Sequence, residues 1–132
     1  MITGISHITL IVKNMERTAS FLEKIFDAKE VYASPTAKYF LIGNTWVALN
    51  IGEPLSKRTY NHIAFAIDDN DFDEYVSRVK NVGAEILRGR ERISADGRSI
   101  YFYDYDNHLF ELHTGSLEER LACYTSKGEI NP

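Results

Sequence analysis

The sequence predicts an α+β fold made of two copies of a βαβββ module, and three observations support this prediction. The strand-like stretch at 5–12, Ile-Ser-His-Ile-Thr-Leu-Ile-Val, returns at 61–67 as Asn-His-Ile-Ala-Phe-Ala-Ile. Each copy runs into an acidic or amide turn and then into a helical pattern of apolar residues. Each helical pattern is followed by three further strand-like segments. A repeat of this length indicates one supersecondary unit that is used twice.

The two copies carry a histidine at the same point, His7 in the first and His62 in the second. Side chains on a strand alternate between its two faces. One face is uniformly apolar, with Ile8, Leu10 and Val12 in the first copy and Ile63, Phe65 and Ile67 in the second. Because the following helix should cover this apolar face, we expect both histidines on the opposite face of the sheet, which we call the open face.

Length and composition fit one ordinary domain. A chain of 132 residues with 44% apolar content can bury a hydrophobic core. We expect one domain over 1–124, with module one at about 1–52, module two at about 59–115 and a C-terminal helix at about 116–124. Residues 125–132 are expected to form a loose tail.

Charge and cysteine content limit the partners and the compartment. The formal net charge of −4 argues against nucleic acid as a partner. Cys123 is the single cysteine, so an intrachain disulfide is impossible and a reducing compartment fits. The N-terminus has no signal-peptide pattern, and no window approaches the ~20 apolar residues of a membrane span. We therefore expect a cytoplasmic protein with no membrane partner.

Turn residues divide the first module into its elements. Asn14 is an expected N-cap, and the apolar spacing after it predicts a helix over 15–26. The expected strands are Lys29–Ala33 and a hairpin of Tyr39–Ile42 and Trp46–Asn50, followed by a linker over Gly52–Thr59.

The second module repeats this order. The expected elements are a helix over about Asp71–Val82, a short strand Glu85–Leu87, a charged loop Gly89–Arg98, and a hairpin of Ser99–Tyr103 and Leu109–His113. Ser116 with Glu119 matches a capping box, which predicts a last helix from there to about Tyr124. We expect Cys123 to be a buried or half-buried residue of this helix.

Glu111 stands in the middle of the last predicted strand, between the apolar residues Phe110 and Leu112. By alternation its carboxylate points to the open face, where His7 and His62 also point. Two imidazoles and one carboxylate can form a three-ligand site for a divalent metal, with positions left for water or substrate.

Simpler roles for these residues are also open. A strand histidine can be a structural residue with satisfied hydrogen bonds, and a lone glutamate in a closing strand can face water. His108 lies in a predicted turn and is expected to be solvated. His113 is a candidate for contacting a metal ligand rather than the metal.

Several cations belong to the segments that frame the open face. Arg92, Arg98 and Arg120 lie in or near these segments, and Lys38 is expected near their rim. Arginines with tyrosine and serine hydroxyls suit a phosphate, a phosphonate or a carboxylate. Alternatively, Arg98 and Arg120 are surface charges with local partners such as Glu118. The sequence has no glycine-rich phosphate loop, no Cys-x-x-Cys pair and no nucleophile elbow.

Four stretches match a known family. They are Gly4–Thr9, Tyr60–Phe65, Gly97–Asp104, and Asn107–His113 followed by Gly115–Leu121. Through them the chain resembles, over about residues 1–124, the vicinal-oxygen-chelate superfamily of glyoxalases, bleomycin-resistance proteins and dioxygenases. Within it, the chain is most similar to the fosfomycin-resistance proteins of the FosX type, the hydrolase branch, rather than to the glutathione-using FosA or the bacillithiol-using FosB.

The resemblance implies paired βαβββ modules in a homodimer with shared active sites. It assigns His7 of one subunit, and His62 with Glu111 of the other, to one divalent metal, typically Mn²⁺, with other divalent metals possible. The metal would bind the epoxide and phosphonate oxygens of fosfomycin and act as a Lewis acid while the C–O bond breaks. The implied reaction is hydration of the epoxide to the diol.

The resemblance also assigns roles around the metal. Thr9 matches the family's active-site threonine, which lies beside the epoxide. The residues that match phosphonate-binding positions are Arg92, Ser99, Tyr101 and Arg120, and those that match the walls of the site are Tyr39 and Trp46.

One segment departs from the FosX pattern. FosX hydrolases carry a general-base glutamate on a longer loop, whereas this loop is only Ser34–Lys38 and Ala37 stands at the matching position. Glu30 or Glu53 could substitute, but nothing in the sequence places either at the site. Two alternatives remain open: a transferase that adds glutathione, bacillithiol or cysteine to fosfomycin, and a non-catalytic protein that binds metal and phosphonate.

Overall fold

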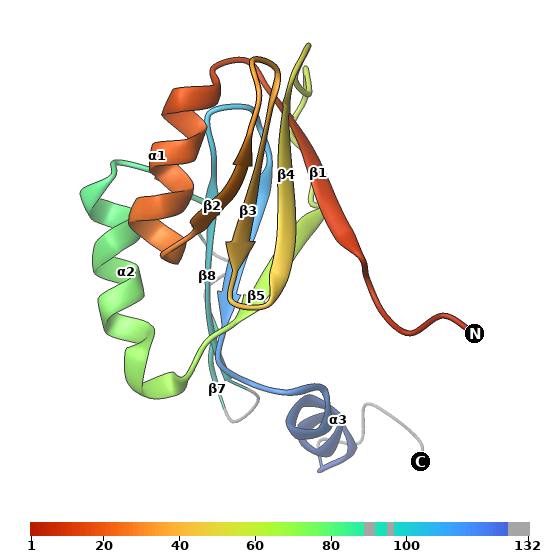
Figure 1. Cartoon of the computed structure of the whole chain (residues 1–132). Helices are drawn as coiled ribbons and strands as arrows, with labels where there is room; N and C mark the ends of the chain where they lie inside the picture. Colours follow the sequence, from red (N-terminus) through yellow and green to blue (C-terminus); the bar gives the residue numbers. More distant parts are fainter. Residues whose placement is uncertain (89–91, 95–96, 127–132) are drawn as a thin grey trace. The chain divides into compact units, whose positions relative to one another are not determined.

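The computed structural model describes residues 1–88, the backbone of 92–94, and residues 97–126. The chain forms two compact units. The first unit comprises Met1–Thr59 together with the turn Asp104–His108, and the second comprises the rest of the described chain. Figure 1 shows the elements of both units along the sequence.

The first unit contains one helix and one four-stranded sheet. Its elements are β1 (His7–Val12), α1 (Met15–Phe26), β2 (Lys29–Ala33), β3 (Ala37–Ile42) and β4 (Thr45–Ile51). The strand order is β1-β4-β3-β2, with β1 and β4 parallel and the other pairs antiparallel. A parallel β1–β4 pair needs a long crossover connection, and α1 with the β2–β3 hairpin provides it.

The second unit repeats this plan with additions. Its elements are β5 (His62–Ala66), the 3₁₀-helix η1 (Asp69–Asp71), α2 (Phe72–Asn81), β6 (Glu85–Ile86), β7 (Arg92–Ser94), β8 (Gly97–Tyr103), β9 (Leu109–His113) and α3 (Leu117–Ser126). The strand order is β5-β9-β8-β6, and β7 pairs with β8. As in the first unit, the first and last strands, β5 and β9, are parallel neighbours.

Local sequence explains where α1 begins and ends. The Asn14 side chain accepts a hydrogen bond from the backbone N–H of Arg17 at 3.0 Å, which satisfies one of the free donors of the first turn. Asp27 ends the helix in the left-handed conformation with φ of 53°. The face that carries Leu22 and Ile25 is fully buried. No helix in the described part of the chain is both long and apolar enough to cross a membrane.

The predicted alternation of faces is confirmed in both sheets. In β1, Leu10 and Val12 are buried, whereas His7 and Thr9 are exposed. In β5, His62, Ala64 and Ala66 are more exposed than the intervening Ile63 and Phe65. The histidine therefore lies on the open face in each unit.

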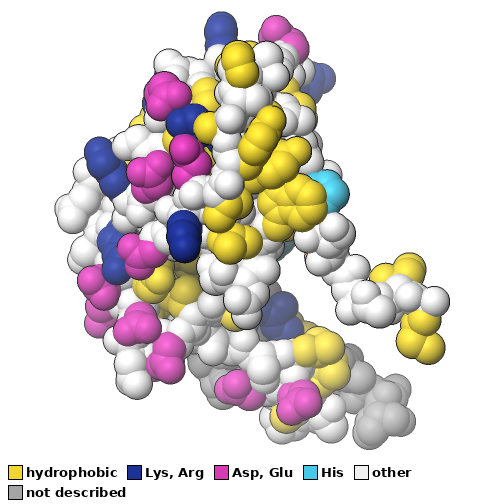
Figure 2. Space-filling view, in the orientation of Figure 1, with side chains coloured by type: hydrophobic (Ala, Val, Ile, Leu, Met, Phe, Trp, Pro, Cys, Tyr) yellow, Lys and Arg dark blue, Asp and Glu magenta, His cyan; other side chains and the backbone are white. Residues whose placement is uncertain are grey.

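Apolar side chains also reach the surface, as the yellow patches in Figure 2 show. On the open face of the first sheet, Ile11, Tyr32 and Leu41 are 37%, 49% and 36% exposed. A sheet face of this composition is suited to burial against another protein surface.

The helix over 15–26 and the strand Lys29–Ala33 are found as predicted. The charged loop predicted over Gly89–Arg98 is wrong at 92–94 and 97–98, and its other residues lie outside the described part of the chain. Arg92–Ser94 forms an edge strand, and the next strand begins at Gly97, whose φ is +110°. An edge strand can present charged side chains to water, so its composition resembles that of a loop.

The ends of several other elements also differ from the prediction by one or two residues, as β3 and the last helix show. Strand β3 begins at Ala37, two residues before the predicted Tyr39. The last helix continues to Ser126, so the first two residues of the predicted tail are helical, and the remainder of that tail lies outside the described residues. Cys123 is half-buried in this helix, as predicted.

The β8–β9 turn is held by one buried carboxylate. Asp104, 6% exposed, accepts hydrogen bonds from the backbone N–H groups of Asp106 and His108 at 2.8 and 2.9 Å. The Nδ1 atom of His108 lies 2.7 Å from the same carboxylate, so the prediction of a solvated His108 is wrong. Asp106 in turn accepts from the backbone N–H of Lys13, which ties the turn to the segment after β1.

We expect Asp104→Ala to lower the free energy of unfolding by about 3 kcal/mol, because it leaves several buried donors without an acceptor. Urea denaturation at constant m-value measures this change. Glu23→Ala, at an exposed position on α1, is the control and should change stability by less than about 0.5 kcal/mol. Equal stability of the two variants would contradict the role given to Asp104.

Candidate metal and anion site

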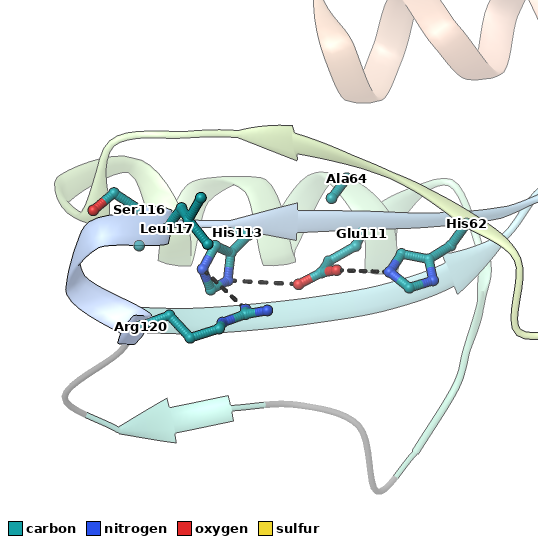
Figure 3. A pocket seen from close by; sticks show the side chains of 8 residues that line it. His62, Ala64, Glu111, His113, Ser116, Leu117 and Arg120 are labelled. Carbon is teal, nitrogen blue, oxygen red and sulfur yellow. Dashed lines mark hydrogen bonds and ion pairs between the residues drawn. The ribbon is translucent and has the colours of Figure 1, made fainter. Parts of the chain in front are cut away.

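His62 and Glu111 face each other on the open face of the second sheet (Figure 3). Parallel pairing of β5 with β9 places Ala64 opposite Glu111. His62 lies two residues before Ala64 in β5 and therefore points to the same face. The Nε2 atom of His62 lies 3.1 Å from Oε1 of Glu111. Glu111 is only 4% exposed, so it is not the water-facing edge residue of the simpler interpretation.

The hydrogen bonds of His62 determine which nitrogen faces the carboxylate. Its Nδ1 atom lies 2.7 Å from the carbonyl oxygen of Tyr60, and a carbonyl can only accept. Nδ1 therefore carries the proton, as is usual for a metal-binding histidine that is oriented by a backbone carbonyl. When the ring is neutral, the Nε2 lone pair is therefore directed at the carboxylate oxygen of Glu111.

Two acceptors at 3.1 Å repel unless a cation, either a proton or a metal ion, lies beside them. Adjacent ligand atoms of an octahedral ion at ~2.1 Å are separated by about 3 Å. The separation of the two atoms and their chemistry therefore fit a divalent metal. Within the described residues, no group of three or more His, Cys, Asp and Glu side chains is close enough to hold an ion, so a metal at this pair would need further ligands.

His7, the third predicted ligand, belongs to the first unit. It is exposed at the start of β1, where its ring stacks on Trp46 at 4.1 Å between centroids and its Nδ1 lies 2.9 Å from the hydroxyl of Ser6. Tyr39 packs beside Trp46 at 5.2 Å between centroids. Thr9 is the next open-face residue of β1 and is exposed.

The indole N–H of Trp46 is buried and has no hydrogen-bond partner within the described chain. A buried donor without an acceptor costs stability. An acceptor oxygen from outside this chain would satisfy it. His7, Thr9, Tyr39 and Trp46 thus form one polar and aromatic cluster on the open face of the first sheet.

Ser99 holds the second oxygen of Glu111. Its hydroxyl lies 2.6 Å from Oε2 of Glu111 and 2.6 Å from Nδ1 of His113. Ser99 is fully buried and does not line the pocket described below, although the family resemblance assigned it to the phosphonate. In this structure Ser99 contacts a carboxylate and an imidazole, and its phosphonate-binding role stays a prediction.

Tyr101 lies beside Glu111 in the neighbouring strand β8. Burial, the contact with Tyr60 and the nearby Glu111 charge raise the pKa of the Tyr101 phenol well above its usual value, so it remains protonated at neutral pH. The Tyr60 hydroxyl donates to the Tyr101 oxygen at 3.2 Å, and the Tyr60 ring lies 4.7 Å from that of His62. Tyr60 has no role predicted from the sequence, because a residue two positions before a strand histidine has no distinctive pattern.

Arg120 reaches the same face from α3 (Figure 3). Ser116 caps this helix by accepting from the backbone N–H of Glu119 at 3.1 Å, as the capping box predicted. A pocket of about 270 Å³ is lined by His62, Ala64, Glu111, His113, Gly115, Ser116, Leu117 and Arg120. Since the small side chain of Ala64 leaves space beside the carboxylate, an anion could contact both the guanidinium and a metal in this pocket.

Two other predicted cations, Arg98 and Lys38, do not line this pocket. Arg98 lies against α2, with Nε 2.9 Å from a carboxylate oxygen of Asp69 and its guanidinium over the ring of Phe72. Arg98 is therefore a charge with local partners, as the alternative interpretation of the sequence proposed. The strand of Arg92 pairs with β8, but its side chain lies outside the described residues.

Lys38 points away from the open face, contrary to the prediction that it lies near the rim. It alternates with Tyr39 along β3, and its Nζ lies 2.9 Å from Glu30 and 3.4 Å from Glu16. The hydrogen bond to Glu30 raises the pKa of Lys38. Glu30 is thereby engaged on the helix-covered side, whereas Glu53 is exposed beyond the end of β4.

The paired strand-helix-strand units with a histidine at matching points define a class of protein. The chain belongs to the Glyoxalase/Bleomycin resistance protein/Dioxygenase superfamily, whose family model matches residues 4–112.

Individual relatives narrow this assignment. The chain is 55% identical to the fosfomycin resistance protein FosX of Listeria innocua, covering 94% of this chain and 98% of the relative. It is 45% identical to the metallothiol transferase FosB of Staphylococcus haemolyticus, covering 94% and 92%.

Solved structures agree with the same assignment. FosX of Listeria monocytogenes complexed with Mn(II) and sulfate superposes with a TM-score of 0.88 at 55% identity, covering 94% of this chain and 99% of that one. A mutant of that protein complexed with Mn(II) and 1S,2S-dihydroxypropylphosphonic acid also gives a TM-score of 0.88, at 54% identity and the same coverage.

We expect Glu111→Gln to raise the dissociation constant for Mn²⁺ by more than about 100-fold, because the amide removes the ligand charge while keeping its shape. Electron paramagnetic resonance of free Mn²⁺ during titration measures the constant. Glu85→Gln, an exposed glutamate on β6 of the same sheet, is the matched control and should bind Mn²⁺ like the wild type. Stoichiometric, tight Mn²⁺ binding by Glu111→Gln would refute the assignment of the carboxylate.

Proposed function

We propose that this protein opens the epoxide of fosfomycin, a small phosphonate, with the aid of a divalent metal, Mn²⁺, and adds water to give the diol. The observation that carries the proposal is the 3.1 Å separation between Nε2 of His62 and Oε1 of Glu111, beside a pocket that Arg120 also lines. The FosX relatives support the identity of the metal and the product, since one of their structures contains Mn(II) and a dihydroxypropylphosphonic acid.

His62 and Glu111 would hold the metal together with His7 of the partner subunit in a homodimer. The exposed apolar side chains on the open face of the first sheet support a protein partner there. When bound, the metal supplies Lewis acidity toward the epoxide oxygen.

The chain's own side chains would bind and orient the substrate. Arg120 would pair with the phosphonate, because its guanidinium offers donors in a planar fork that matches such oxygens. Thr9 would lie beside the epoxide, with Tyr39 and Trp46 as walls. Tyr101 stays a neutral phenol and therefore adds no charge to the site. The phosphonate-binding role of Arg92 stays a prediction, since its side chain lies outside the described residues.

Thiol transfer is the second candidate, and the open face of the first sheet favours it. Hydrolysis needs a general base, but the open-face residues Thr9, Ala37 and Tyr39 carry no carboxylate. Glu30 is paired with Lys38 on the helix-covered side of the sheet. Absence of a general base typically costs ~10²–10⁴-fold in rate, whereas a thiolate needs no base at the moment of attack. The FosB relatives, named metallothiol transferases, are consistent with such a reaction. A protein that only binds metal and phosphonate is the third candidate.

Phosphorus NMR of the Mn²⁺-loaded protein with fosfomycin distinguishes these candidates. We expect the diol to form in water without any thiol. Product that appears only with glutathione, cysteine or bacillithiol would replace hydrolysis by thiol transfer. Tight binding of fosfomycin without turnover, with or without any of the thiols, would support a protein that only binds metal and phosphonate.

We expect Arg120→Ala to weaken fosfomycin binding by about 10- to 100-fold and Mn²⁺ binding by less than about 3-fold, because the guanidinium contacts the anion and not the metal. Calorimetry with Mn²⁺, and then with a phosphonate at saturating Mn²⁺, gives both constants. Arg78→Ala on α2 removes the same charge elsewhere in the second unit and should change neither. Equal losses for metal and phosphonate in Arg120→Ala would contradict the assignment.

Two broader predictions accompany this function. A single cysteine is consistent with a cytoplasmic location. The division into one domain over 1–124 with a short tail also stays a prediction, which limited proteolysis would test.

A further inference from the structure

His113 ends β9 next to the site and has no role in the function proposed so far. Its side chain is 13% exposed, and it lies on the open face two residues after Glu111. A Cβ atom on Gly97 would lie 3.1 Å from Cε1 of this ring and 2.6 Å from the backbone nitrogen of Gly115. Because Gly97 has no side chain, the start of β8 approaches closely and confines the imidazole.

The contacts of Nδ1 indicate which nitrogen of the His113 ring carries the proton. Nδ1 lies 2.6 Å from the Ser99 hydroxyl, which is itself 2.6 Å from Oε2 of Glu111. An ionised carboxylate only accepts, so the single Ser99 proton is donated to Glu111. The Ser99 oxygen must then accept from His113, and Nδ1 carries a proton.

The other ring nitrogen faces the anion-binding side chain. With the proton on Nδ1, the neutral ring has its lone pair on Nε2, and Nη2 of Arg120 lies 3.5 Å from this atom. This contact is long, and a small movement of the guanidinium would shorten it to an ordinary hydrogen bond. Figure 3 shows His113 between Arg120 and Glu111.

We propose that His113 is a positioning residue that orients the metal-binding carboxylate of Glu111 through Ser99 with one ring nitrogen and the phosphonate-binding guanidinium of Arg120 with the other. The inference rests on the proposed function, since it assigns the metal to Glu111 and the phosphonate to Arg120. Groups that orient a metal ligand typically change metal affinity by ~10–100-fold when they are removed.

Two amide substitutions separate the two contacts. The amide nitrogen of an asparagine occupies the place of Nδ1, whereas the amide of a glutamine reaches the place of Nε2. His113→Asn should keep Mn²⁺ affinity within about 3-fold and weaken phosphonate binding about 10-fold, because it can donate to Ser99 but cannot reach Arg120. His113→Gln should do the reverse, with Mn²⁺ binding about 10-fold weaker.

Both constants can be measured without turnover. Free Mn²⁺ is followed by electron paramagnetic resonance, and propylphosphonate, which lacks the epoxide, is titrated at saturating Mn²⁺. His108→Asn and His108→Gln are matched controls, since that ring contacts Asp104 in the β8–β9 turn, and neither should change the two constants.

The outcomes separate the inference from the function on which it rests. If wild-type protein binds both probes and the two His113 variants change both constants alike, the inference is overturned and the proposed function stands. If wild-type protein binds neither probe, the proposed function fails and the inference fails with it.

A measurement on wild-type protein tests the inference even if the variants do not fold. Long-range ¹⁵N–¹H spectra of the metal-free protein report which ring nitrogen of each histidine is protonated. The inference requires a proton on Nδ1 of His113 and none on Nε2. A neutral ring with its proton on Nε2 would overturn it, because that nitrogen could then not accept from Arg120.

Discussion

The second unit depends on how one buried carboxylate is satisfied. An ionised side chain at 4% exposure, as in Glu111, is costly unless charge or hydrogen bonds compensate for its lost hydration. The protein compensates one oxygen with the hydroxyl of Ser99 and leaves the other facing the Nε2 atom of His62. One carboxylate oxygen therefore has a hydrogen-bond donor within the sheet, whereas the other favours a nearby cation. The pocket and the orientation of His113 follow from this arrangement.

Equivalent positions in the two modules carry different side chains. In the first sheet Thr9 pairs with Ala48 in the last strand, and in the second sheet Ala64 pairs with Glu111. Each module keeps its histidine, but only the second has a carboxylate at this point.

The predictions that failed depend on contacts between distant segments. Lys38 was expected near the rim of the open face, and Arg98 either at that face or paired locally, yet each pairs with acidic residues on the helix-covered side. His108 was expected to be solvated because turns usually are, but it contacts the buried Asp104. Composition does not report these partners, because an ion pair forms wherever packing brings opposite charges together. The strand over 92–94 was missed for a similar reason, since its pairing with β8 determines its conformation.

The sequence by itself determined the repeat and the face to which each strand residue points. A strand has a period of two residues whatever lies beside it, so the open-face positions of His7, His62 and Glu111 could be predicted from alternation. Only the tertiary structure decided which atoms face each other. The roles of Ser99 and His113 as neighbours of the carboxylate depend on the register of β8 against β9. Register is a property of paired strands, and a shift of one residue would turn these side chains to the opposite face.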